Sequence, residues 1–122
     1  MRWERANAML RLESLHHRYG EVIALHDVSL RAEPGQIFAL LGASGSGKTT
    51  ALRVVAGFVQ PAQGRVFLED RDMSDRPPEA RGMGVVFQEY ALFPHLDVAR
   101  NIAFGVSKAE ANARVLEMLR LV

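Results

Sequence analysis

The chain has 122 residues, 48% of them apolar, and its 15 basic and 14 acidic residues give a net charge of +1. That length allows one domain with a real core, and the charge balance does not favour a large nucleic-acid-binding surface, so no nucleic-acid partner is expected. Cysteine is absent, which excludes a disulfide framework and a thiolate metal site. No apolar run reaches membrane-spanning length and no signal-peptide core is visible, which favours the cytoplasm.

The N-terminal third is expected to be rich in antiparallel strands. Residues 1–8 have mixed charges and no clear period, and are interpreted as an N-terminal extension. Alternating or short apolar runs predict strands over residues 9–16, 22–25 and 28–30. Tyr19-Gly20 and Glu33-Pro34-Gly35 predict turns.

The central stretch has the strongest local pattern in the chain. The apolar run 36–41 predicts a buried strand, and residues 50–56 predict a helix that ends at Gly57. Between them lies the sequence Gly42-Ala43-Ser44-Gly45-Ser46-Gly47-Lys48-Thr49, which matches G-x-x-x-x-G-K-[ST], the P-loop pattern. Its glycines would let backbone N–H groups wrap a polyphosphate, while Lys48 reaches the β- and γ-phosphates and Thr49 coordinates Mg²⁺.

Two other interpretations of this stretch fit the sequence less well. A Gly/Ser-rich linker could contain Lys-Thr by coincidence, but a linker does not require a strand before it and a helix after it. A dinucleotide site needs a third glycine or alanine where Thr50 stands. The sequence therefore predicts a site for a nucleoside triphosphate.

The remaining chain alternates turns, short strands and helices. A turn at 61–64 leads into a strand at 65–68, and Asp75 is expected to cap a short helical turn that starts at Pro77 or Pro78 and ends at Gly82. The apolar run 83–87 predicts a second buried strand, which ends at Gln88. Asp97 is expected to cap a helix over 98–104, closed by Gly105. Ser107 and Glu110 form a capping-box pattern before a helix that continues to Val122.

Three stretches together resemble the N-terminal half of an ABC transporter ATPase subunit. They are Arg18-Tyr19-Gly20, the P-loop 42–50, and Val85 to His95 with Asn101-Ile102-Ala103-Phe104-Gly105 behind it. Pro77-Pro78-Glu79-Ala80-Arg81 resembles the ferric iron and polyamine importers in particular. The resemblance implies an α/β fold: a truncated P-loop NTPase core with an antiparallel β subdomain and the start of a helical subdomain at 96–122, all within a nucleotide-binding domain that begins at residue 9.

The resemblance also implies roles for individual residues. Tyr19 matches the aromatic on which adenine stacks, although it could instead be a turn tyrosine covering the sheet. Gln88 matches the glutamine that touches Mg²⁺ and the attacking water, although it could simply cap a turn. Lys48 and Gln88 are thus the catalytic candidates, and Thr49 and Gln88 the metal ligands. The expected nucleotide-binding residues are Tyr19, Gly42, Ser44, Gly45, Ser46, Gly47, Lys48, Thr49 and Thr50.

The implied cofactors are ATP and Mg²⁺, and the implied partners are a permease and a second ATPase subunit in a homodimer. Residues 88–96 match the segment that receives the permease, with a loop pinned to its own core as the alternative. Through the permease the protein would lie at the inner face of the membrane.

Parts of the family pattern do not follow Gln88 in this sequence. They are an L-S-G-G-Q-type loop, an apolar strand ending in Asp-Glu, and a switch histidine. The segment from Val66 to Asp70 is apolar and then acidic, but it follows the P-loop helix too closely to be the Asp-Glu strand. It is expected to be an edge strand that runs into a turn. We therefore expect a truncated form of a longer subunit that binds nucleotide and hydrolyses it poorly. The alternatives are a non-hydrolysing binding module and another P-loop enzyme such as a small-molecule kinase.

Overall fold

The computed structural model describes residues 9–121, so the extension expected over residues 1–8 lies outside the described part. The chain divides into two compact units, whose described residues are 9–85 and 86–121. Each unit is described by itself.

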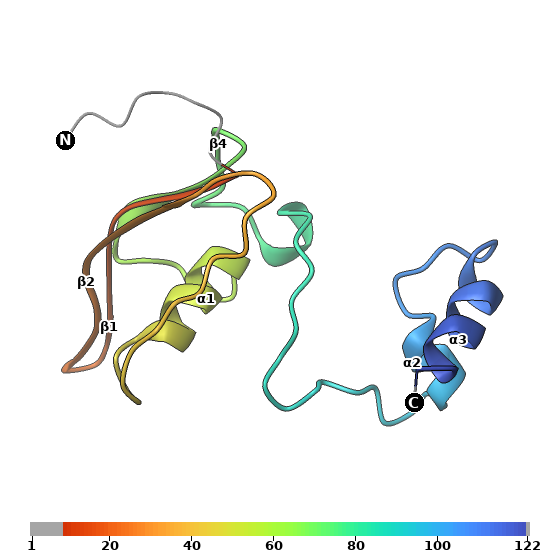
Figure 1. The fold of residues 1–122 in the computed structure, drawn as a ribbon. Coiled ribbons are helices and arrows are strands. Elements are labelled where there is room, and N and C mark those ends of the chain that lie inside the picture. Colours follow the sequence, from red (N-terminus) through yellow and green to blue (C-terminus); the bar gives the residue numbers. More distant parts are fainter. Residues whose placement is uncertain (1–8, 122) are drawn as a thin grey trace. The chain divides into compact units, whose positions relative to one another are not determined.

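The first unit is built on an antiparallel sheet with the strand order β2-β1-β3-β4 (Figure 1). The strands are β1 (Leu10–Tyr19), β2 (Val22–Ala32), β3 (Gln63–Leu68) and β4 (Arg71–Asp72). Strands β1 and β2 confirm the antiparallel section expected before the P-loop, with β1 longer than expected and the two short runs of β2 joined into one strand. Strand β3 confirms the strand expected at 65–68.

Irregularities in the β1–β2 ladder shape the sheet. Ser14 and Asp27 have positive φ angles, and the N–H of Ser14 donates to the hydroxyl of Ser29 at 2.9 Å. Further along, His17 pairs with Leu25 and Arg18 pairs with Ile23, so Ala24 is the extra residue of a bulge in β2. This bulge lies beside the end of β1 that carries Tyr19.

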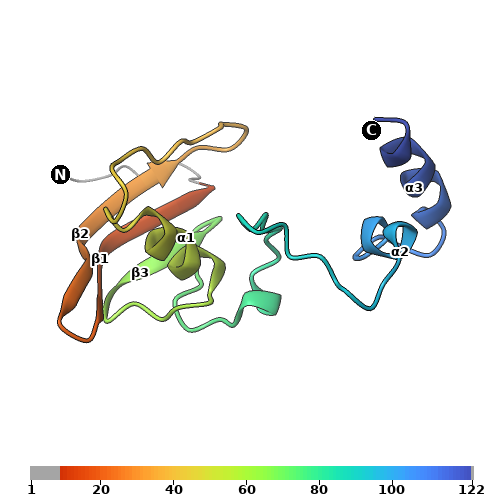
Figure 2. The same cartoon turned by 90° about the horizontal axis from the view of Figure 1, so that it is seen from below.

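Helix α1 (Lys48–Ala56) packs on one face of this sheet (Figures 1 and 2). It confirms the helix expected after the P-loop and begins two residues earlier. Its apolar face and the inward residues of the strands form the core, which comprises Leu12, Leu15, Leu25, Ala51, Val54, Val55 and Val66. The sheet thus holds the helix that follows the P-loop.

Arginine 81 closes the other end of α1. Its guanidinium donates to the carbonyl oxygens of Val54 and Val55 at 2.9 and 2.8 Å, and the side chain is 3% exposed. The last carbonyls of a helix have no intrahelical partners, so Arg81 supplies a donor to Val55 and a second donor to Val54, which also accepts from the N–H of Gly57. Gly57 has a left-handed φ of 86° and leaves room for this side chain, since a Cβ there would stand 2.6 Å from Arg81 Nε.

The predictions of two buried strands are wrong. Residues 36–41 and 83–87 have no strand structure, and Ile37 and Val86 are 100% and 96% exposed. Both runs carry the apolar composition of a strand buried on two faces, but such a strand also needs neighbours to accept its backbone hydrogen bonds. Within residues 9–121 the sheet pairs neither run, and apolar composition alone does not create a ladder.

The short helical turn of the first unit forms as η1 (Pro78–Ala80), but its capping differs from expectation. Its N-cap is Pro77, with no side-chain cap, so Asp75 is not the cap. Proline fixes the backbone angle that the first turn needs, which makes a capping carboxylate dispensable.

The second unit contains α2 (Val98–Ile102) and α3 (Ala111–Leu119). Asp97 caps α2 as expected, accepting from the N–H of Arg100 at 2.8 Å, although α2 ends before residue 104. The prediction of a capping box at Ser107 is wrong. The Ser107 hydroxyl bonds to the Glu110 carboxylate at 2.6 Å instead of to the backbone, and α3 begins after Glu110.

Candidate functional site

The P-loop is an exposed turn that leads directly into α1. Ser46 N–H donates to the carbonyl of Ala43 at 3.2 Å, which closes the turn, and Gly47 is the N-cap of the helix. No side chain caps this helix end, and no acidic residue lies in its first turn. The first backbone N–H groups of α1 are therefore available to an anion, and the helix dipole favours negative charge there.

The loop is fixed to the sheet through Gly47. This residue has a left-handed φ of 89°, and a Cβ on it would overlap the carbonyl oxygen of Ala24 and lie 3.2 Å from Leu25 Cδ2. Ala24 is the extra residue of the β2 bulge, so the irregularity in the strand is where the P-loop meets it. Only glycine allows both the backbone angle and the close approach.

The ammonium group of Lys48 lies within the loop. Its Nζ donates to the carbonyl oxygens of Gly42 and Ala43 at 2.8 and 2.6 Å, and to the hydroxyl of Ser46 at 3.2 Å. These contacts place the positive charge beside the free N-terminus of α1. Two positive features, the ammonium and the helix end, thus converge on the space that the loop encloses.

The remaining P-loop residues differ in exposure. Ser44, Gly45 and Thr49 are exposed, whereas Thr50 is buried on the core side of α1. The Thr49 hydroxyl is therefore accessible to a metal bound by phosphate, and Thr50 can reach an anion only through its backbone N–H. Within residues 9–121, no group of three or more His, Asp or Glu side chains could hold a metal ion by itself.

Tyr19 lies at the end of β1 on the side of the sheet that faces α1. Leu25 belongs to the core, and His17 pairs with it across the ladder. Tyr19 follows His17 by two residues along β1, so the side chains of His17, Tyr19 and Leu25 lie on the same face of the sheet. Leu25 also meets Gly47. The structure therefore brings Tyr19 and the P-loop to the same side of β1 and β2, with Tyr19 46% exposed.

Gln88 belongs to the second unit, where it lies in an exposed turn. The next turn residues, Tyr90 and Ala91, have positive φ angles of 61° and 47°. The metal-binding and catalytic role of Gln88 stays a prediction. Glu69 and Asp70, weighed as an acidic strand end, form the turn between β3 and β4 with φ angles of 48° and 60°.

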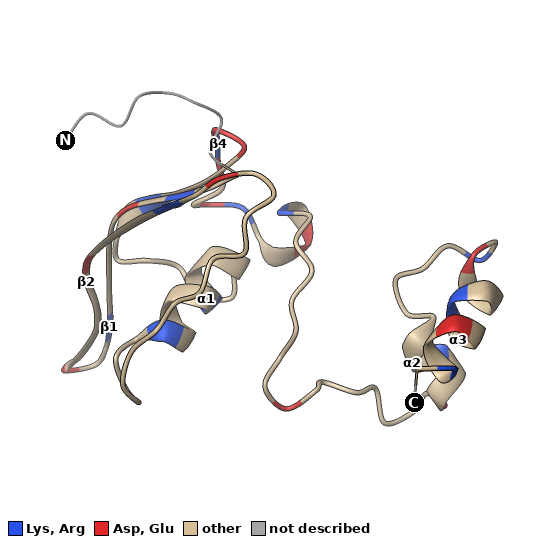
Figure 3. Ribbon diagram, viewed as in Figure 1, with Lys and Arg blue, Asp and Glu red and all other residues tan. Residues whose placement is uncertain are grey.

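The segment 88–96 is held at one end and exposed at the other. Asn101 accepts from the N–H of Phe93 at 2.9 Å and donates to the carbonyls of Phe93 and Leu96 at 3.2 and 2.9 Å. The Phe93 ring packs on Phe104, with ring centroids 4.2 Å apart. Tyr90 is 82% exposed, and Glu89 is the single charged residue of the segment (Figure 3). The segment is thus held in place by Asn101 around Phe93 and Leu96, and it exposes apolar side chains near Tyr90.

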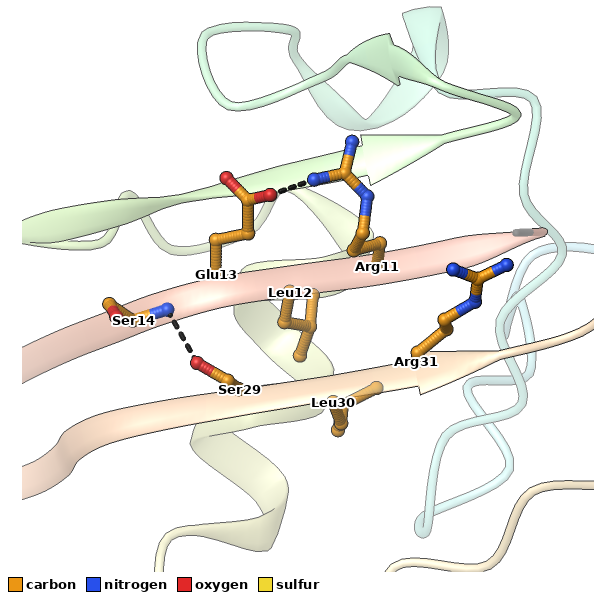
Figure 4. A pocket seen from close by; sticks show the side chains of 7 residues that line it. All are labelled: Arg11, Leu12, Glu13, Ser14, Ser29, Leu30 and Arg31. Atoms are coloured by element: carbon orange, nitrogen blue, oxygen red, sulfur yellow. Dashed lines mark hydrogen bonds and ion pairs between the residues drawn. The ribbon is translucent and has the colours of Figure 1, made fainter. Parts of the chain in front are cut away.

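A pocket of about 280 Å³ lies elsewhere, between β1 and β2 (Figure 4). Its arginines have acidic partners: Arg11 pairs with Glu13, and Arg31 with Glu33 at 2.5 Å. None of the expected nucleotide-binding residues lines it. Its charges are already compensated, which argues against an anion site there.

Arg81 supports the end of α1, a role that no sequence motif predicts. It is the last residue of the Pro77–Arg81 motif, noted only as a family feature. Burial lowers the pKa of its guanidinium, which is nevertheless held by four carbonyl acceptors: those of Val54, Val55, Ser74 and Arg76. The sequence feature that could have indicated this role is Gly57, because a glycine at the C-cap leaves the end of α1 accessible to a cationic side chain.

Comparison with known proteins gives a consistent picture. A family model described as ABC transporter matches residues 25–122. The putative 2-aminoethylphosphonate import ATP-binding protein PhnT of Salmonella typhimurium is 51% identical over 116 residues, which are 91% of this chain and 31% of that protein. The putrescine transport ATP-binding protein PotG of Escherichia coli is 50% identical over 119 residues, 93% of this chain and 32% of that protein. The chain thus spans about a third of the length of these curated relatives.

Solved structures agree with this fold. The ATP-binding cassette MJ0796, in a dimeric post-hydrolysis state bound to ADP and Pi, superposes with a TM-score of 0.77 at 28% identity. The match covers 92% of this chain and 56% of that one. The ADP conformation of the cassette MJ1267 gives a TM-score of 0.59 at 33% identity over 62% of this chain and 30% of that one. Among residues 9–121, no helix is long and apolar enough to cross a bilayer.

Proposed function

The chain belongs to the ABC transporter family, and on that premise we propose that it is the N-terminal part of an importer's ATP-binding subunit. The proposal includes a nucleotide-binding domain that begins at residue 9 and a helical subdomain that begins near residue 96. The import activity itself is proposed from the relatives, since this chain spans about a third of their length.

The observation that carries the proposal is the bare N-terminus of α1. Gly47 provides neither a side-chain cap nor a Cβ, and no acidic side chain occupies the first turn. A Ser, Thr, Asp or Asn at this position would satisfy one of these N–H groups with its side chain, which glycine lacks. A triphosphate would satisfy these N–H groups, and the adjacent ammonium of Lys48 would compensate its charge.

The site residues fit ATP with Mg²⁺. Lys48 would exchange its contacts with the Gly42 and Ala43 carbonyls for phosphate oxygens, and the exposed hydroxyl of Thr49 would hold the ion. When bound, Mg²⁺ supplies positive charge to the phosphate oxygens. Tyr19 would stack on the adenine, and Gln88 would contact the ion and the attacking water.

We further propose that segment 88–96 docks a permease. Its tip carries exposed aromatic and aliphatic side chains, while Asn101 fixes its base, an arrangement that suits a small apolar interface. Through this contact the protein would lie at the cytoplasmic face of a membrane. A second subunit would complete the nucleotide site, and the dimeric state of the MJ0796 cassette supports this proposal.

Hydrolysis by this chain alone is proposed to be slow, because no L-S-G-G-Q-type loop and no Asp-Glu strand follow Gln88 in this sequence. Phosphoryl transfer depends on positioned groups that stabilise charge, and those motifs would supply several of them.

Steady-state phosphate release, with Lys48→Ala as the control, distinguishes the remaining possibilities. Slow release that Lys48→Ala abolishes supports an ATPase part, whereas tight ATP binding with no release supports a binding module. Transfer of the γ-phosphate to a small acceptor would contradict both and favour a kinase.

A further inference from the structure

We propose that His17 is a positioning residue for Tyr19, and that its ring fixes the orientation in which Tyr19 stacks on a nucleotide base. The inference rests on the proposed role of Tyr19 and extends it to a neighbour that no motif marks. The base would be a purine, recognised through its π-face.

The two rings are in direct contact. Their centroids are 4.7 Å apart and their planes meet at 78°, an edge-to-face arrangement. This geometry is a favoured one for aromatic pairs, because the positive edge of one ring meets the negative face of the other. Tyr19 remains 46% exposed, so the contact with His17 leaves part of the ring open to a ligand.

The side chain of the half-buried His17 makes no hydrogen bond within residues 9–121. Its Nδ1 and Nε2 are both inaccessible to solvent, and neither has a hydrogen-bond partner in the described part of the chain. A buried polar atom without a partner is unfavourable, so histidine is a poor choice for packing alone. The contact that the ring does make is with Tyr19.

The position of His17 connects Tyr19 with the P-loop. His17 pairs across the ladder with Leu25, whose side chain meets Gly47. A base on Tyr19 and phosphates at the N-terminus of α1 would therefore be held by segments that are in contact through Leu25 and Gly47. Fixing the Tyr19 ring before a ligand arrives reduces the conformational entropy lost on binding.

His16 and His26 provide an internal comparison. Their rings also meet edge to face, with centroids 5.1 Å apart. His16 alternates with His17 along β1, so this second pair belongs to the other face of the sheet. His26→Ala therefore removes an equivalent ring contact without touching the proposed base platform.

The test measures the affinity of the intact protein for Mg²⁺–ATP and for inorganic tripolyphosphate, which lacks a base. His17→Leu introduces an apolar side chain without a ring, and His17→Phe retains an aromatic ring but removes the two nitrogens. We expect His17→Leu to weaken ATP binding about 2- to 10-fold, the range of one aromatic pair. We expect His17→Phe and His26→Ala to leave it within about twofold and tripolyphosphate binding to be the same in all variants.

Each outcome is decisive. Unchanged ATP affinity in His17→Leu overturns the positioning role, as does an equal loss in His17→Phe and His17→Leu. Equal weakening of ATP and tripolyphosphate shows a general structural effect and also overturns it. Tyr19→Ala separates the two proposals: if it leaves ATP affinity unchanged, the base platform itself fails, whereas a loss there with none in His17→Leu refutes the role of His17 alone.

Discussion

Gly47 packs its bare Cα against the carbonyl oxygen of Ala24, so the loop before α1 is anchored to the bulge in β2. The P-loop is therefore positioned from two directions. The core holds the body of α1 on the sheet, and the Gly47–Ala24 contact holds its first residue. The free helix N-terminus, the Lys48 ammonium and the Tyr19 ring all depend on this arrangement.

Substitution of Gly47 should therefore displace the loop. Gly47→Ala combines the strain of a left-handed angle, about 1–2 kcal/mol, with overlap on Ala24, and we expect loss of measurable ATP binding. Gly82→Ala is the matched control, because Gly82 also has a positive φ of 64° but no atom lies within 4 Å of its Cβ position. Calorimetric titration with Mg²⁺–ATP measures both variants. Normal affinity in Gly47→Ala would show that the anchoring contact is dispensable.

Removal of the Arg81 guanidinium should destabilise α1. Arg81→Ala removes the guanidinium donor from the carbonyls of Val54 and Val55, and Val54 then keeps only the N–H of Gly57. We expect a loss of about 2–4 kcal/mol in the free energy of unfolding. Arg76→Ala removes a nearby exposed arginine and should change stability by less than about 0.5 kcal/mol. Urea denaturation followed by circular dichroism compares them. Equal midpoints for the two variants would contradict the capping role.

The Asn101 contacts should control the order of segment 88–96. Asn101→Ala removes the acceptor of the Phe93 N–H and the donor to Phe93 and Leu96, so exchange of the Phe93 amide hydrogen should accelerate at least about tenfold. Asn112→Ala, an exposed asparagine on α3, is the control. Hydrogen exchange measured by NMR gives the exchange rate of the Phe93 amide. An unchanged rate in Asn101→Ala would show that the Asn101 contacts do not order this segment.

Asp72 should give stability a small dependence on acid pH. Hydrogen bonds from Ser74, first from its side chain and then from its backbone, hold the pKa of Asp72 below its usual 3.8. Because this pKa is depressed in the folded state, the carboxylate contributes stability above pH 3.8 and loses it as the pH falls through the folded value. Asp72→Asn should therefore flatten the stability curve below about pH 4 relative to wild type. Asp75→Asn is the control, and identical slopes for wild type and Asp72→Asn would contradict the assignment.

Local patterns were sufficient to predict the elements that depend on local interactions. The antiparallel strands before residue 33, the helix after the P-loop and the Asp97 cap are all confirmed. Each is specified by residues close together in the chain, through side-chain alternation, a glycine at a helix end, or a capping carboxylate.

Features that depend on distant partners could not be predicted in the same way. The runs 36–41 and 83–87 have the composition of buried strands, but a parallel strand forms only where neighbours complete its hydrogen bonds. The meeting of Gly47 with Ala24 and of Arg81 with Val54 joins residues more than 20 positions apart. The motif located the residues that are expected to bind phosphate, whereas the contacts that position them could be found only in the structure.

The central claim, that this loop binds a nucleoside triphosphate, is tested most directly by the affinity for Mg²⁺–ATP of the wild-type protein and of Lys48→Ala. Arg53→Ala, which removes an exposed cation from the same helix, is the matched control. The structure predicts saturable binding that Lys48→Ala weakens at least about tenfold, because a charge-assisted contact to phosphate is lost, and that Arg53→Ala leaves within about twofold. Equal ATP affinity in wild type and Lys48→Ala, or no saturable binding by the wild-type protein, would contradict it.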